Sequence, residues 1–122
     1  MEKYYWLNND SRTFLKRGYI EGDKTPEERI RQIALAAQRR LGFDGFADNF
    51  EDYMSRGWYS LASPIWANFG LKRGLPISCF GSYIGDTMDS ILTGVAEVGM
   101  MSKMGGGTSA YFGDLRARGT EI

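Results

Sequence analysis

A single cysteine, Cys79, lies in a short apolar run, and the residues around it are of types that suit redox chemistry on a nucleotide. Ser78 supplies a hydroxyl beside the thiol, Asp86 begins a helix pattern soon afterwards, and three glycines follow at positions 105–107. A helix N-terminus favours phosphate, and glycine lets a backbone approach a ligand closely. Reduction by thiols takes two electrons and therefore two cysteines. We expect the chain to be one part of a larger catalyst.

Each of these residues also has an ordinary structural interpretation. A cysteine in an apolar strand is most often an inert small hydrophobic residue. The sequence contains no histidine, so a Cys–His nucleophile of the hydrolase kind is excluded. A helix cap accounts for Asp86, and a helix stop followed by a turn accounts for the glycines. Taken one at a time, the signals leave both interpretations open.

Local motifs give only weak support for phosphate recognition. The glycine run at 105–107 follows a predicted helix, and the dipole at that end of a helix disfavours an anion. Neither a Walker lysine pattern nor a Gly-x-Gly-x-x-Gly fingerprint is present in the sequence. Arg116 and Arg118 are cations that could pair with phosphate, although arginines near a chain end are commonly solvated.

Composition and charge exclude several classes of protein. A chain of 122 residues suffices for one small domain, and 15 basic and 15 acidic side chains leave no net charge. We therefore expect no nucleic-acid partner and no membrane partner. No apolar run approaches the roughly 18 residues of a membrane span. One cysteine and no secretory segment predict a cytoplasmic protein. We expect no metal ligands, since a zinc site is disfavoured without histidine, whereas a carboxylate site stays open.

The first half of the chain is predicted to be a solvated helical layer, because residues 1–56 carry 20 of the 30 charged side chains. Residues 3–7 are aromatic and apolar, which fits either a short strand or a docked arm. Thr25 begins a helix with a capping box and a proline at the first position, and Gly42 ends it. Its apolar face is expected to comprise Ile30, Ile33, Ala34, Ala37 and Leu41.

A second helix is predicted over about 47–55, and Gly57 follows its end. Residues 60–75 mix short helical and turn signals and give no assignment. The inward side chains of the second helix are expected to be Phe50, Tyr53 and Met54.

The second half is predicted to alternate strand, helix and strand, which is typical of an α/β fold. Residues 76–84 are short and apolar enough for a buried strand. Asp86 is expected to cap the next helix, with Asp89 at its third position. Residues 108–112 alternate as a second strand, and a parallel pair requires a crossover of this size. The apolar stripe of the helix is expected to be Met88, Ile91, Leu92, Val95 and Val98.

Five motifs in a fixed order resemble the large, catalytic subunit of ribonucleotide reductase, and most of all its aerobic class I form. The opening around Tyr5-Trp6-Leu7-Asn8 and Arg17-Gly18-Tyr19 resembles the same family, so the resemblance covers essentially the whole chain. The motifs are Ala-Ser-Pro-Ile-Trp-Ala-Asn-Phe-Gly, Leu-Pro-Ile-Ser-Cys-Phe, Gly-Asp-Thr-Met-Asp-Ser-Ile, Ser-Lys-Met-Gly-Gly-Gly-Thr-Ser-Ala-Tyr and Leu-Arg-Ala-Arg-Gly.

The resemblance implies a helical N-terminal region over 1–60 that leads into an α/β barrel. Residues 61–122 would be the first strand, helix and strand of that ten-stranded barrel, which is incomplete in this chain, and would include a specificity-site helix. The barrel of the family is built from two five-stranded halves, and the strand with Cys79 would be its first.

The resemblance also implies a substrate site. Cys79 would be one of two redox cysteines, would protonate the departing ribose 2′-hydroxyl and would end in a disulfide with a cysteine further along the full sequence. Ser63 and Ser78 match positions that hydrogen-bond the ribonucleotide and its phosphates, with Ser63 standing where the family often has threonine. Gly107 matches a glycine whose backbone lies against the substrate.

An allosteric effector site is implied as well. Asp86, Thr87 and Met88 match the start of the helix that holds a deoxynucleotide effector at the dimer interface. Arg116 matches an effector-binding arginine. A dNTP or ATP would be the effector, and no other cofactor is expected on this chain.

The partners implied are parts of a larger assembly. They are the remainder of the large subunit, a separate small subunit that carries the radical cofactor, a second large subunit, the ribonucleotide substrate, and thioredoxin or glutaredoxin. The chain ends before the family's radical-bearing cysteine and second redox cysteine, so it is expected to be a fragment or the product of a split gene, inactive alone. The alternative hypothesis is a non-catalytic nucleotide-binding or dimerisation module.

Overall fold

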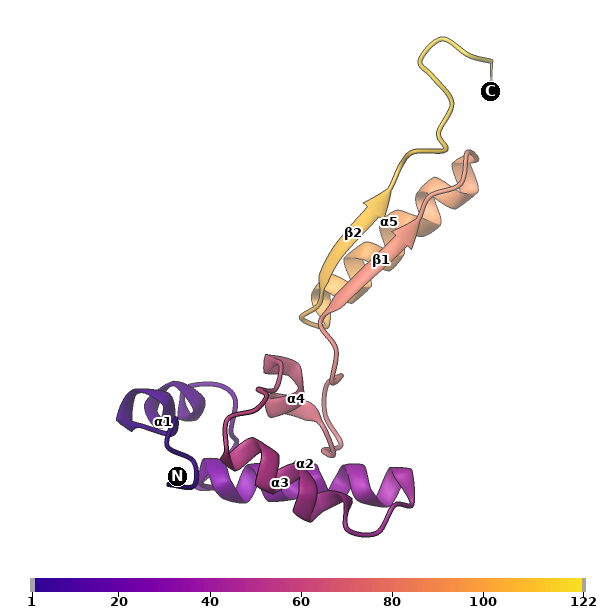
Figure 1. The fold of residues 1–122 in the computed structure, drawn as a ribbon. Helices are drawn as coiled ribbons and strands as arrows, with labels where there is room; N and C mark the ends of the chain where they lie inside the picture. Colours follow the sequence, from indigo (N-terminus) through magenta and orange to yellow (C-terminus); the bar gives the residue numbers. More distant parts are fainter. Residues whose placement is uncertain (1, 122) are drawn as a thin grey trace. The chain divides into compact units, whose positions relative to one another are not determined.

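The computed structural model describes residues 2–121 and divides into two compact units, Met1–Pro76 and Ile77–Ile122. The first unit is helical, and the second consists of two strands with a helix between them (Figure 1). The α/β pattern is therefore confirmed for the second half only. The ten-stranded barrel remains an expectation, because residues 2–121 contain the two strands of one small sheet.

Four helices make up the first unit. They are α1 (Asn9–Lys16), α2 (Pro26–Leu41), α3 (Phe46–Ser55) and α4 (Ser63–Asn68). Helix α1 was not predicted, although its cap is an ordinary one in which the Asn8 side chain accepts the N–H of Ser11. Helix α3 confirms the prediction over about 47–55, and α4 lies within residues 60–75, for which no element is predicted.

The residues before α1 form a docked arm and no strand. The backbone N–H of Tyr4 donates to Ser55 O at 2.9 Å, and the Trp6 indole N–H donates to Met54 O at 2.9 Å. Leu7 is buried in the same cluster of apolar side chains as Met54. Since turns run through residues 3–6, the docked-arm interpretation is confirmed and the strand interpretation is wrong.

Helix α2 begins and ends where the sequence predicts. Thr25 and Glu28 form both hydrogen bonds of the capping box, and Gly42 ends the helix in the left-handed conformation with φ 63°. The expected apolar face is correct at its centre, where Ile30, Ile33 and Ala34 are buried. It is wrong at Leu41, which is 62% exposed, because the last turn of α2 extends past the buried cluster.

The inward face of α3 is also only partly as expected. Met54 is buried and Phe50 packs partly buried against the core, whereas Tyr53 is 43% exposed. Tyr53 stacks instead on the exposed ring of Trp58, with ring centroids 5.0 Å apart. Stacking on the surface therefore replaces the burial that the spacing predicted.

A buried arginine joins α2 to α4. The Arg29 side chain is 1% exposed. One of the acceptors of its guanidinium is the side chain of Gln32, at 2.8 Å. Burial, together with the nearby positive charge of Arg73, lowers the pKa of Arg29, although arginine remains charged. The other acceptors are carbonyl oxygens at the end of α4, those of Trp66 (2.8 Å), Phe69 (2.9 Å) and Ile65 (3.2 Å).

This contact places α4 in the helical unit. Trp66 of α4 is 6% exposed and belongs to the core cluster with Ile30 and Ile33. The compact units accordingly divide between Pro76 and Ile77, later in the chain than the boundary predicted between residues 60 and 61. The predicted boundary concerns the domains of the resembled family, which the division into compact units does not test. It therefore stays a prediction.

The second unit is a parallel β–α–β arrangement of β1 (Cys79–Tyr83), α5 (Met88–Lys103) and β2 (Gly107–Tyr111). The register pairs Cys79 with Gly107 and Tyr83 with Tyr111. Both strands and the helix were predicted, and their parallel pairing follows from the crossover that α5 provides. Helix α5 lies close to the chain after β1, because an added Cβ at Gly94 would overlap the Ile84 side chain.

Three expectations for the second unit are wrong. The cap of α5 is Thr87, whose hydroxyl accepts the Ser90 N–H at 3.1 Å, and not Asp86. Strand β1 is largely exposed rather than buried, because α5 packs on two strands and can cover one face only. The stripe predicted for α5 is split, since Ile91 and Val98 are half-buried and the others are exposed, namely Met88, Leu92 and Val95.

Among the helices of residues 2–121, none combines the length and the apolar character that crossing a bilayer requires.

Replacing Arg29 with methionine is expected to lower the free energy of unfolding by about 3 kcal/mol, because buried carbonyl groups at the end of α4 lose a charged donor. Chemical denaturation followed by tryptophan fluorescence measures this change, since Trp66 lies at the contact. Arg39→Met is the matched control, as Arg39 lies on the same helix with an exposed side chain. Equal stability of the two variants would contradict the role assigned to Arg29.

Candidate functional site

The structure brings three of the predicted substrate-site residues together at the start of the parallel pair. The Gly107 backbone N–H donates to Ser78 O at 2.6 Å, and Gly107 stands opposite Cys79 in the register. The Ser78 hydroxyl lies 4.0 Å from the Cys79 sulfur. Cys79 is a free, exposed thiol. A thiol, a hydroxyl and a side-chain-free backbone segment therefore occupy one small region.

The thiol lies on the open face of the sheet. Side chains alternate along a strand, and the exposed positions alternate with more buried ones in both β1 and β2. Thr108 points to the covered face, where its hydroxyl lies 3.2 Å from that of Ser102 in α5. The open face consists of Cys79, Gly81 and Tyr83 from β1 and Gly107, Ser109 and Tyr111 from β2.

Two tyrosines end this open face. The rings of Tyr83 and Tyr111 are stacked, with centroids 6.2 Å apart and planes 20° apart. The Tyr83 hydroxyl donates to Asp114 Oδ2 at 2.6 Å, and this hydrogen bond to a carboxylate raises the pKa of Tyr83. Between the tyrosines and Cys79 the face carries only glycine and serine, so it is open along most of its length.

At the opposite end of the pair, the structure brings together Asp86 and Arg116. The Arg116 Nε donates to Asp86 Oδ2 at 2.6 Å, its backbone N–H donates to Oδ1 at 3.2 Å, and its Nη2 donates to Asp86 O at 3.1 Å. Donation from the backbone N–H, together with the guanidinium, lowers the pKa of Asp86. Arg116 Nη1 also donates to Glu121 O. These bonds join the start of α5 to the segment after β2.

Thr87 and Met88 follow Asp86 directly at this end. Thr87 is the cap of α5, and Met88 is its first residue, with 60% of its surface exposed. In an open sheet of parallel strands, ligands bind beyond the carboxyl ends of the strands. Asp86, Thr87, Met88 and Arg116 all lie at that end, whereas Cys79 and Gly107 lie at the other.

Ser63 belongs to the other compact unit, where it is the first residue of α4. The prediction that it shares a substrate site with Cys79 remains a prediction. Within residues 2–121, the cysteine and carboxylate side chains form no group of three or more that could hold a metal ion.

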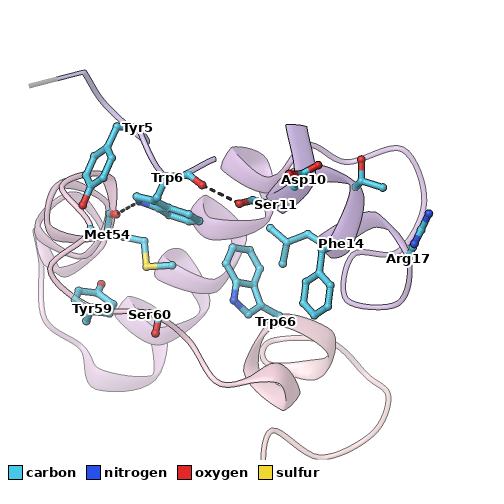
Figure 2. A pocket seen from close by; sticks show the side chains of 13 residues that line it. Tyr5, Trp6, Asp10, Ser11, Phe14, Arg17, Met54, Tyr59, Ser60 and Trp66 are labelled. Atoms are coloured by element: carbon cyan, nitrogen blue, oxygen red, sulfur yellow. Dashed lines mark hydrogen bonds between the residues drawn. The ribbon is translucent and has the colours of Figure 1, made fainter. Parts of the chain in front are cut away.

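A groove in the first unit is separate from every predicted site residue. Its volume is about 920 Å³, and its lining includes Trp6, Phe14 and Trp66 (Figure 2). The Trp6 N–H bond to Met54 O and a bond of 2.9 Å from the Ser11 hydroxyl to Trp6 O fix one wall. Tyr59 of the lining donates to Phe50 O at 2.8 Å, and its burial, with a smaller effect of Tyr4, raises the pKa of Tyr59 to about 12.

Comparison with known proteins shows which family this chain belongs to. The family described as "Ribonucleotide reductase, all-alpha domain" matches residues 5–74, which is more than half of the chain. The chain belongs to the ribonucleotide reductase large-subunit family. The resemblance drawn from its motifs is thereby confirmed, and the part of the family that it matches is the N-terminal region.

Curated relatives and a solved structure agree with this family. The chain is 38% identical over 94 residues to the ribonucleoside-diphosphate reductase large subunit of Invertebrate iridescent virus 3, covering 76% of this chain and 15% of that protein. It is 30% identical over 131 residues to the subunit alpha of Synechocystis sp., covering 96% of this chain and 17% of that protein. The chain thus spans less than a fifth of these relatives.

The solved structure is similar over nearly all of this chain. The Actinobacillus ureae class Id ribonucleotide reductase alpha subunit matches with a TM-score of 0.92 and 62% sequence identity. The match covers 98% of this chain and 23% of that subunit.

The sequence did not indicate two features of the second unit. One is the contact between Gly106 and the Phe80 ring, where an added Cβ would lie 2.5 Å from the ring. The other is the Tyr83–Asp114 hydrogen bond. The run of three glycines was the available signal for the first. No sequence pattern pairs Tyr83 with Asp114.

Asp86→Asn is expected to loosen the segment after β2 and to speed tryptic cleavage after Arg116 about threefold, as the loss of an exposed ion pair allows. Because the pKa of Asp86 is lowered in the folded protein, the stabilisation is present above the ordinary aspartate pKa. It is lost as pH falls through the lowered value. The variant should lack this pH dependence.

Timed tryptic digestion near neutral pH, analysed by mass spectrometry, measures the cleavage rate. Hydrogen exchange of the Arg116 amide, which donates to Asp86 Oδ1, measures the pH dependence in the two chains. Asp89→Asn serves as the control, because Asp89 is an exposed carboxylate in the first turn of α5. Identical cleavage rates in the wild-type and Asp86→Asn chains would show that the ion pair does not hold the segment.

Proposed function

We propose that this chain is the N-terminal part of a ribonucleoside-diphosphate reductase large subunit and takes part in the radical-based reduction of ribonucleotides to deoxyribonucleotides. The observation that carries the proposal is the exposed thiol of Cys79, which lies opposite Gly107 at the start of a parallel strand pair. The 62% identity to a class Id alpha subunit supports it.

Cys79 is the redox residue of this proposal. Its thiol gives a proton to the 2′-hydroxyl of the ribose, which leaves as water. Loss of the 2′-hydroxyl is a two-electron reduction of the ribose. The two electrons come from Cys79 and a second cysteine, whose thiols are oxidised together to a disulfide. A single cysteine in this sequence requires the second to come from the remainder of the large subunit. Thioredoxin or glutaredoxin then reduces the disulfide for the next turnover.

The other substrate-site residues bind and orient the ribonucleotide. The Ser78 hydroxyl lies beside the sulfur and donates to or accepts from the ribose. Gly107 leaves its backbone open to the substrate because no side chain covers it. Ser63 is assigned to the phosphates. The radical that starts the reaction is supplied by a cofactor in the separate small subunit.

The opposite end of the sheet is assigned to an allosteric effector. Asp86 accepts from the effector's ribose, Arg116 pairs with its phosphates, and Thr87 and Met88 at the start of α5 complete the site. A dNTP or ATP is the effector. The exposed apolar side chains of α5 support a dimer of large subunits at the same helix, as they would be covered there: Met88, Leu92 and Val95.

A second candidate is a non-catalytic nucleotide-binding or dimerisation module. The observation in its favour is that the Asp86–Arg116 pair is complete within this chain, whereas the redox pair of cysteines is not. The two candidates differ in whether Cys79 is required for turnover of the assembled enzyme.

The purified chain is expected to form no deoxyribonucleotide by itself. Turnover is expected when it is mixed with a polypeptide that supplies the rest of the large subunit and with the small subunit. In that mixture Cys79→Ser should reduce multiple-turnover activity by at least about a thousandfold, since the reducing dithiol is lost. Chromatographic assay of deoxynucleoside diphosphate measures the rate.

Thr93→Ser is the control, because Thr93 is exposed on α5, and this variant should keep full activity. Turnover by the chain alone, or by the Cys79→Ser mixture, would contradict the redox role. Binding of deoxynucleoside triphosphate without turnover in the complete mixture would instead favour the module.

A further inference from the structure

We propose that Phe80 and Gly106 are positioning residues that hold Gly107 opposite Cys79. The inference rests on the proposed function and adds two residues to it. Phe80 directly follows the thiol, and Gly106 directly precedes the glycine whose backbone faces the substrate. The contact between them therefore lies one residue away from each side of the site.

The geometry of the contact leaves no room for a side chain at position 106. An ideal Cβ there would lie 2.5 Å from Cε2 and 2.6 Å from Cδ2 of the Phe80 ring, and 3.2 Å from the backbone oxygen of Met101. The ring closes one side and the last turns of α5 close the other. The Gly106 N–H also donates to Met101 O at 3.0 Å, so the glycine is held from both directions.

The three consecutive glycines meet three different requirements. Gly105 has a φ of 87°, which a residue with a side chain adopts only with strain. Gly106 does not have a positive φ. Glycine is therefore needed at this position for space and not for its backbone conformation. Gly107 has an open backbone, with Ser78 O the nearest atom at 3.4 Å from an added Cβ. Space beside Phe80 is thus a separate reason for the middle glycine.

A methyl group at position 106 would disturb the site through the strand spacing. Phe80 is half-buried, and a rigid ring moves as a unit, so the overlap would push β1 and the glycine loop apart. The first bond to suffer is the 2.6 Å hydrogen bond from the Gly107 N–H to Ser78 O. Its loss would move the Gly107 backbone away from the thiol and from the bound ribose.

Gly106→Ala is expected to lower kcat/KM of the complete mixture about tenfold, because displacement of a positioned group by a fraction of an ångström has an effect of this order. The double variant Phe80→Val with Gly106→Ala is expected to recover to within about threefold of Phe80→Val alone, since the smaller side chain makes room. Gly18→Ala is the matched control, because nothing lies within 4 Å of an added Cβ there and Gly18 lies outside the second unit.

A structural readout accompanies the kinetics. Hydrogen exchange of the Gly107 amide in the chain should be faster in Gly106→Ala and slow again in the double variant, whereas thermal unfolding detects a general loss of the fold. Full activity of Gly106→Ala, or failure of the smaller residue at position 80 to restore both activity and exchange, would overturn the proposal. Failure of the proposed function itself is distinguished by the Cys79→Ser assay, which does not depend on this contact.

Discussion

Parallel pairing of two short strands is the constraint on which the arrangement of the second unit depends. Parallel strands cannot be joined by a tight turn, so a crossover helix has to separate them. That helix is α5, and its length brings Cys79 and Gly107 side by side although they are distant in sequence. The same pairing brings Asp86 and Arg116 together at the other end. Two candidate sites are thus consequences of one register.

The helical unit depends on a different interaction. Short helices expose a large share of unpaired carbonyl groups at their ends, and α4 has six residues. Arg29 supplies the missing donors from α2. Its burial is tolerated because no buried nitrogen of its guanidinium lacks a hydrogen-bond acceptor. Helix α4, which begins at Ser63, is therefore stabilised by the buried Arg29 guanidinium, because a helix of six residues has few hydrogen bonds of its own.

The second unit exposes apolar surfaces, as expected of a chain that matches only part of its larger relatives. One face of the sheet and one side of α5 carry exposed aromatic and apolar side chains, among them Tyr83, Tyr111, Leu92 and Val95. Surfaces of this kind are usually covered by further protein. The chain spans 23% of the class Id alpha subunit that it matches, so most of that protein lies outside it.

The sequence by itself determined the features that depend on neighbouring residues. The capping box at Thr25, the glycine stop at Gly42 and the order of strand, helix and strand after residue 76 all follow from local bonding and periodicity. The motifs also indicated the family. Tertiary structure decided what distant segments do to one another. Arg29 became a core residue, Asp86 paired with Arg116 instead of capping α5, and Gly106 met the Phe80 ring. Burial could not be predicted from apolarity either, because the exposure of β1 depends on how many elements cover it.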